Sequence, residues 1–174
     1  MLVFCDQFLK VFVFFENQAN NLPYSFGPFL NITYVENPGI AFGVGSGLGP
    51  IFKFFLTLFR LFAVIFISFF FVSIIKKKRV CLLGCVPFSL VLSGAIGNVV
   101  DSVFYAFVGL NKDSNDLFQG AVIDMFHFSF FPPVFNLADS FVCVGVFCLF
   151  VFQTNIVLNK KKSIWSDFKG LFLR

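Results

Sequence analysis

Four long apolar stretches limit what this chain of 174 residues can fold into. They cover residues 1–18, 54–75, 80–110 and 134–158. A helix needs about 20 mostly apolar residues to cross the hydrocarbon core of a bilayer, and all but the first stretch reach that length. Charged residues make up only 13% of the chain, whereas a soluble domain carries about 25%. The sequence therefore predicts an all-α polytopic membrane protein, built as a bundle of four transmembrane helices.

Two clusters of basic residues orient these stretches in the membrane. Lys76–Arg79 follow the second stretch, and Lys160–Lys162 follow the fourth. Positively charged connections stay in the cytoplasm, and two spans separate the clusters, so both clusters lie on the same side. We therefore expect both termini and the tail 159–174 in the cytoplasm, and the connections 16–53 and 109–133 outside. The net charge of +4 reflects this asymmetry and gives no case for a nucleic-acid partner.

Three charged residues lie where a simple span would be apolar. Arg60 lies inside the second stretch, and we expect its long side chain to extend toward the membrane interface. Asp6 and Lys10 come too early for a helix that starts at Met1 to have crossed about 30 Å of hydrocarbon. We therefore expect the first span, 1–18, to lack its beginning. The start of the chain has no basic segment or small-residue cleavage site, so it does not resemble a cleavable signal peptide.

The cysteines give no sign of a metal or redox site. There are five of them, Cys5, Cys81, Cys85, Cys143 and Cys148, and no pair has the C-x-x-C spacing. His127 is the single histidine, and we interpret it as an interfacial residue. Small apolar packing explains the cysteines better than metal binding does, so we predict neither a metal nor another cofactor.

Polar residues near the outer ends of the third and fourth stretches stand out from their apolar surroundings. Asn98 and Asp101 are three positions apart, and so are Asn136 and Asp139. That spacing places each pair on one face of a helix. Because both pairs lie at the outer boundary in the predicted topology, two polar faces from neighbouring spans arrive at the same depth.

A further acid, Asp124, lies in the outer connection between two short apolar runs, Ala121–Ile123 and Met125–Phe126. An acid with such neighbours is unlike an ordinary solvated loop residue. Asp113 and Asp116, in contrast, lie in a polar stretch, and we assign them no role.

Glycines and prolines indicate how these segments meet. Gly94 and Gly97 would let another helix or a substrate approach the third stretch closely. Pro132 and Pro133 come just before the fourth stretch, and they predict the start of its helix.

The acids at this face of the membrane leave three readings open. Two carboxyl groups close together in a poorly solvated site do not both ionise easily, so one keeps a proton and the pair can activate a water molecule. The same residues could instead cap helix ends and bond one another, or carry protons or cations in a transporter. The spacing alone favours the structural reading over catalysis or transport.

Five sequence blocks, in order along nearly the whole chain, point to a family. The blocks are Asp6–Lys10 for D-Q-x-x-K, Asn31–Gly43 for L-T-Y-V-x-N-x-G-A-A-F-G, Gly97–Asp101 for G-N-x-x-D-R, Val122–Phe126 for V-V-D-F and Phe135–Ser140 for F-N-x-A-D-S. With these blocks the chain resembles bacterial lipoprotein signal peptidases, the membrane aspartic peptidases also called signal peptidase II. Each block alone is weakly specific, whereas five in order with four predicted spans are highly specific.

The resemblance implies an aspartic endopeptidase that removes the signal peptide from diacylglyceryl-modified prolipoproteins. Such an enzyme cuts before the lipidated Cys, at the outer face of the bacterial cytoplasmic membrane. By resemblance, Asp124 and Asp139 are the catalytic acids, and residues 23–50 form a small extracytoplasmic β-cradle. The residues that would support the acids and the substrate are Asn37, Asn98, Asp101, Asn136, Asp6 and Lys10. The implied partners are the prolipoprotein and membrane lipid, and the implied state is a monomer without a cofactor.

The chain departs from the family pattern at positions that leave both catalytic acids in place. Ser102 stands where G-N-x-x-D-R has its Arg, and Ile40 replaces the first Ala of G-A-A-F-G. Residues 109–119 look like a polar insertion. Two other functions remain compatible with this sequence: an inactive homologue that binds lipoproteins without cutting them, and a small proton or ion transport subunit that uses the same acids.

Overall fold

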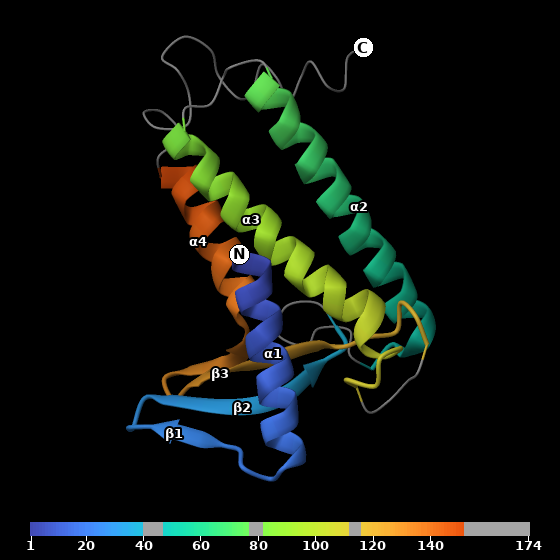
Figure 1. Ribbon diagram of the computed structural model, residues 1–174, viewed down its shortest axis with the longest axis vertical. Coiled ribbons are helices and arrows are strands. Elements are labelled where there is room, and N and C mark those ends of the chain that lie inside the picture. Colours follow the sequence, from blue (N-terminus) through green and yellow to red (C-terminus); the bar gives the residue numbers. More distant parts are fainter. Residues whose placement is uncertain (40–46, 77–81, 112–115, 152–174) are drawn as a thin grey trace.

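The computed structural model describes residues 1–39, 47–76, 82–111 and 116–151. Three helices extend side by side away from a small β-sheet, and the first helix lies beside the sheet and the near end of α3 (Figure 1). In chain order the elements are α1 (Leu2–Gln18), β1 (Tyr24–Phe26), β2 (Leu30–Asn37), α2 (Gly49–Lys76), α3 (Leu82–Val100), the π-helix η2 (Asp101–Tyr105), β3 (Val122–Phe128), β4 (Phe131–Phe135) and α4 (Leu137–Val151).

Apolar surface covers the long helices on the outside of the molecule. In the described part of the chain, the segments Gly49–Lys76 and Gly84–Tyr105 are long and apolar enough to cross a membrane, and Leu137–Val151 is a shorter apolar helix. Only 11% of the most apolar window of α2 is buried. Its exposed side chains include Phe55, Phe59 and Phe62. An apolar surface of this extent is expected against lipid rather than water.

Gly94 and Gly97 let the neighbouring helices α4 and α1 come close to α3, as the sequence predicted. A Cβ atom on Gly94 would lie 2.2 Å from the backbone oxygen of Ala138, and one on Gly97 would lie 2.6 Å from Oδ2 of Asp6. A side chain at either position would therefore force the neighbouring backbone or carboxylate to move. This close packing sets the distance between the polar residues at the sheet end of α3 and those at the start of α4.

The sheet is antiparallel with the order β1-β2-β3-β4. Its central strands pair Val35 with Asp124 and Asn37 with Val122. The described residues of the predicted cradle, 23–39 and 47–50, supply β1 and β2 to the sheet, whereas the second half of the sheet comes from residues 122–135. Asp124, which was predicted to lie in a connection, is thus held in the middle of a strand.

Pro132 and Pro133 lie on β4 and do not begin the helix, which starts at Leu137. β4 is an edge strand of the sheet. An edge strand tolerates proline because one of its sides has no partner strand, so a missing N–H breaks no ladder bond there. The prediction that these prolines start the fourth helix is therefore wrong by a few residues.

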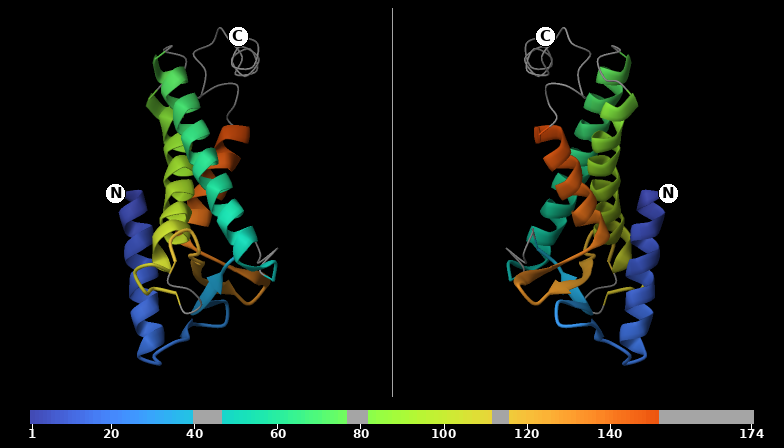
Figure 2. Two further views of the ribbon diagram at one scale, coloured as in Figure 1. Left: turned by 90° about the vertical axis from the view of Figure 1, so that its right-hand side faces the viewer. Right: turned by 90° about the vertical axis from the view of Figure 1, so that its left-hand side faces the viewer.

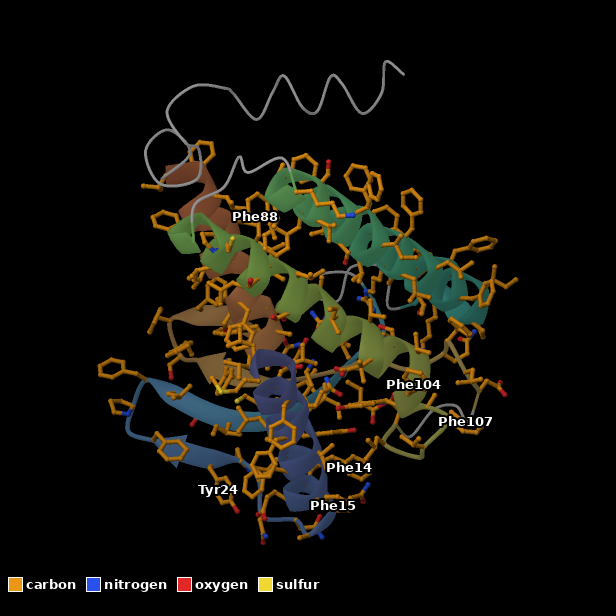
Figure 3. All side chains as sticks on the ribbon, turned by 45° about the horizontal axis from the view of Figure 1, so that its top comes forward. Phe14, Phe15, Tyr24, Phe88, Phe104 and Phe107 are labelled. Atoms are coloured by element: carbon orange, nitrogen blue, oxygen red, sulfur yellow. The ribbon has the colours of Figure 1, made fainter. Side chains whose placement is uncertain are left out.

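A compact apolar cluster lies where α1 meets the sheet and η2. It consists of Val13, Phe14, Tyr105, Ile123 and Met125. Phe14 points into this cluster while the adjacent Phe15 points outward and is 60% exposed (Figure 3). Figure 2 shows from two sides that α1 runs past the sheet, at the end of the molecule away from the last residues of α2 and the first residues of α3. The cluster therefore attaches α1 to β3, the strand that carries Asp124.

Most of the basic residues used to predict the topology lie outside the described residues. Lys76 is the last residue of α2. Residues 77–79 and 160–162 lie outside, as does the predicted tail. The same holds for Ile40 and for residues 112–115 of the predicted insertion.

Candidate active site

Asp124 is a buried carboxylate in the central part of β3, with 2% of its surface exposed. Its Oδ1 accepts a hydrogen bond of 2.7 Å from Nδ2 of Asn136, and its Oδ2 accepts one of 3.1 Å from Nδ2 of Asn37. The neighbouring Ile123 and Met125 are buried as well. The residues next to Asp124 are thus apolar because this part of the strand is buried.

Asp139 lies in the first turn of α4 and forms a reciprocal pair with Asn136, the residue just before that helix. Oδ1 of Asn136 accepts a bond of 2.8 Å from the backbone N–H of Asp139. Oδ2 of Asp139 in turn accepts a bond of 3.3 Å from the backbone N–H of Asn136. This is the arrangement of a capping box, in which two otherwise unpaired N–H groups at a helix start are satisfied together.

Asn136 connects the two carboxylates, because it bonds Asp124 through its side chain and Asp139 through its backbone N–H. Asn98, on α3, completes the arrangement. Its Nδ2 donates to Oδ1 of Asp139 at 2.7 Å, and its Oδ1 accepts from Nδ2 of Asn136 at 3.2 Å. The structure therefore brings together five residues from two strands, two helices and the position just before α4: Asp124, Asp139, Asn136, Asn98 and Asn37.

Asp124 and Asp139 differ in their electrostatic surroundings. Burial, followed by repulsion from Asp139, raises the pKa of Asp124 to about 7, although the bonds from Asn37 and Asn136 favour its charged form. Asp139 is only partly buried. One carboxyl group that holds a proton near neutral pH beside a second, more accessible one is an arrangement that can act as an acid and a base.

Lys10 lies in a second polar cluster, which adjoins the first at Asn98. It contacts two carboxylates, and all three side chains are fully buried. Its Nζ is 2.8 Å from Oδ2 of Asp6 and 2.8 Å from Oδ2 of Asp101. It also donates to Oδ1 of Asn98 at 3.0 Å. Buried charges are tolerated when they are paired and hydrogen-bonded in this way. Removing one partner would leave an uncompensated charge in the interior.

The two acids of this second cluster also hold the backbone beside the first. Oδ1 of Asp6 accepts a bond of 2.8 Å from the N–H of Ala138. Oδ2 of Asp101 accepts a bond of 3.3 Å from the N–H of Ile123. Ala138 directly precedes Asp139, and Ile123 directly precedes Asp124. All the predicted site residues are therefore connected in one network.

Gln7 and Arg60 were not among the predicted site residues, although both bond residues of this region. Nε2 of Gln7 bonds Oδ1 of Asp101 at 2.9 Å, and its Oε1 accepts from the hydroxyl of Tyr105 at 2.9 Å. Arg60 turns inward to Ser102, so the expectation that it extends toward the membrane interface is wrong. The position of Arg60 in the sequence could have indicated a role in the site, because a charged residue inside an apolar helix is a functional candidate by default.

The described residues contain no group of three or more His, Cys, Asp or Glu side chains arranged to hold a metal ion. Cys5, Cys85, Cys143 and Cys148 are free thiols. His127, on β3, pairs in register with Asn31 and Val134 at the sheet and is not part of the carboxylate network. The polar groups that the described network brings together are carboxyl groups and the amides around them.

Comparisons with known proteins agree on one family. The family model described as signal peptidase (SPase) II matches residues 1–155. A lipoprotein signal peptidase of Porphyromonas gingivalis is 31% identical, over 94% of this chain and 85% of its own. One of Syntrophus aciditrophicus is 35% identical, over 94% of this chain and 92% of its own. A solved bacterial membrane enzyme superimposes with a TM-score of 0.58 at 28% identity, over 94% of this chain and 89% of that one.

Proposed function

The chain belongs to the signal peptidase II family, and from this we propose that Asp124 and Asp139 are the catalytic carboxyl groups of its active site. As a member of that family, the protein is an aspartic endopeptidase that removes signal peptides from prolipoproteins at the bacterial membrane. The observation that carries the assignment is the position of Asn136, which bonds both carboxylates at once.

The two acids divide the work of peptide hydrolysis. In the resting site the pair shares one proton, and the burial of Asp124 favours that residue as its carrier. Asp139 removes a proton from a water molecule as the water oxygen attacks the scissile carbonyl carbon. Asp124 gives its proton to the carbonyl oxygen, which forms a tetrahedral diol. When the C–N bond breaks, Asp124 recovers a proton from the diol, and Asp139 gives its proton to the leaving amine.

The amides around the pair keep the carboxylates in these roles. Asn37 and Asn136 each donate to one oxygen of Asp124, and Asn98 donates to one oxygen of Asp139. Fixed donors of this kind cost no reorganisation when charge moves during the reaction. The cluster of Lys10, Asp6 and Asp101 lies behind them and supports the backbone on both sides.

The substrate of this proposal is a prolipoprotein with a diacylglyceryl-modified Cys, cut just before that residue. The signal segment enters laterally from the bilayer while its acyl chains remain in lipid. The site lies at the sheet end of the helices, and Lys76 lies at the opposite end of α2 (Figure 1). This separation supports a cytoplasmic side at the Lys76 end of α2 and a sheet that lies as a cradle on the outer membrane surface. The proposal further takes a bundle of four spans with both termini in the cytoplasm, and a monomer as the working unit.

A cleavage assay with a diacylated lipobox peptide tests the catalytic assignment. Wild type should cut the peptide, whereas Asp124→Asn and Asp139→Asn should each lower the rate by at least about 1,000-fold while they remain inserted in the membrane. Asp116→Asn, in the exposed connection before β3, is the matched control and should cut normally. Full activity of either site variant would remove that acid from the mechanism. Binding without cleavage by wild type would identify an inactive homologue.

A further inference from the structure

Arg60 reaches from the apolar helix α2 into the polar interior next to the proposed active site. Its Nη1 donates to Oγ of Ser102 at 2.6 Å, and its Nη2 donates to the backbone oxygen of Gly39 at 2.6 Å. We propose that Arg60 is a positioning residue for the catalytic pair, and that it supplies from α2 the guanidinium which the G-N-x-x-D-R pattern would place at position 102. This inference rests on the proposed function.

The inward orientation of Arg60 belongs to a polar face of α2. Thr57, three positions earlier on the same helix face, is 1% exposed and donates to the backbone oxygen of Phe118 at 3.2 Å. The other faces of α2 expose apolar side chains. A long cationic side chain in such a helix can extend to the membrane surface at little cost. Arg60 points instead toward an interior where three carboxylates, those of Asp101, Asp139 and Asp124, act on it electrostatically.

One hydrogen-bonded route leads from Arg60 to Asp124. The guanidinium holds the carbonyl of Gly39, and the N–H of Gly39 donates to Oδ1 of Asn37 at 3.1 Å. Because that oxygen is occupied, Nδ2 of Asn37 is directed at Oδ2 of Asp124, 3.1 Å away. Arg60 thereby fixes the chain just after β2 in the position that aims Asn37 at the acid.

A second route leads from Arg60 to α3. Oγ of Ser102 accepts from Nη1 and itself donates to the backbone oxygen of Asn98 at 2.8 Å. Ser102 is fully buried, so its small side chain leaves the space that the guanidinium enters. The planar guanidinium of an Arg suits this place because its separate nitrogen atoms donate to two acceptors at once. The ammonium group of a Lys has a single nitrogen atom and cannot reproduce that geometry.

Relocating the cation tests the proposal in the cleavage assay. Arg60→Ser should lower kcat at least about tenfold with little change in KM, because the misplaced Asn37 acts on the reacting acid. The double variant R60S/S102R, which exchanges the two residues, should recover most of that loss. Arg60→Lys should recover only part of it. Lys53→Ser removes another cation from the same helix, one whose side chain makes none of the bonds described above, and should cut like wild type.

The outcomes separate a positioning role from a purely structural one. Each variant is first compared with wild type for yield and thermal unfolding in detergent. If the R60S chain does not fold, Arg60→Gln, which loses the charge and keeps a polar side chain, replaces it. Wild-type kcat in the uncharged variant overturns the proposal. So does failure of S102R to raise the activity of a folded R60S chain. If Asp139→Asn also cuts normally, the proposed function fails instead, whatever Arg60 does.

Discussion

Asn136 shows how much of the proposed site depends on single atoms. Its backbone N–H and its Oδ1 each bond Asp139, and its Nδ2 bonds both Asp124 and Asn98, so the residue joins the start of α4 to β3 and α3. A helix cap alone would use only the first two atoms. The third bond, to Asp124, has no capping purpose, since Asp124 lies on a strand. Capping therefore accounts for Asn136 and Asp139, whereas the bond from Asn136 to Asp124 lies outside the cap and is the one that the catalytic proposal uses.

The protonation of Asp124 predicts how activity depends on pH. Its pKa is raised to about 7, so the group stays protonated below that pH and loses its proton above it. If Asp124 is the acid of the pair, kcat should fall as the pH rises through about 7. Asn37 donates to Asp124 and favours the charged form, so Asn37→Ala should raise the pKa and move the alkaline limb to higher pH. A limb that moves to lower pH in this variant would contradict the assigned role.

The helices and strands differ in how far the sequence predicted them. The apolar stretches predicted α2 and α3 correctly. A helix makes its backbone hydrogen bonds within its own segment, so a local sequence pattern is enough to indicate it. The pairing of β2 with β3 joins residues about 90 positions apart, such as Val35 and Asp124, and no local pattern indicates it. Pro132 and Pro133 suit both a helix start and an edge strand, so the sequence could not decide between them.

Among the site residues, the acids were found by their apolar surroundings and by the family resemblance. The structure brings Asp124 and Asp139 to the same amide, and their catalytic role stays a prediction until the variants are assayed. The direction of Arg60 was missed because the sequence does not show which way a long side chain turns. Only the packing of α2 against the segment after β2 and against Ser102 decides it.

The contact between α3 and α4 is expected to be sensitive to a single methyl group. Gly94→Ala places a Cβ within 2.2 Å of the backbone oxygen of Ala138, which cannot rotate away. The helices should separate, and the variant should lose about 1–3 kcal/mol of stability, measured by thermal unfolding in detergent. Activity should fall too, because Asn98 moves away from Asp139. Gly47→Ala meets nothing within 4 Å and is the matched control. Equal melting of both variants would show that α3 and α4 are not held together here.

At the scale of the whole molecule, the site and the sheet lie at one end of the long helices and Lys76 at the other (Figure 1). This separation predicts the sidedness of the protein in a cell. In a chain whose cysteines are replaced by alanine, Ser129→Cys, in the exposed turn between β3 and β4, should react with a membrane-impermeant maleimide in intact cells. Lys76→Cys should react only after the membrane is permeabilised. The reverse pattern would place the proposed active site in the cytoplasm.

The cluster around Lys10 has a consequence for the motions of the protein. Through Asp6 and Asp101 one ammonium group secures the N–H groups of Ala138 and Ile123, each just before one of the two acids. Local opening at either place has to disturb the same buried ion cluster, so we expect the start of α4 and the middle of β3 to loosen as one cooperative unit. Both carboxylates should then leave and regain their positions together, so that the pair is intact or absent as a whole.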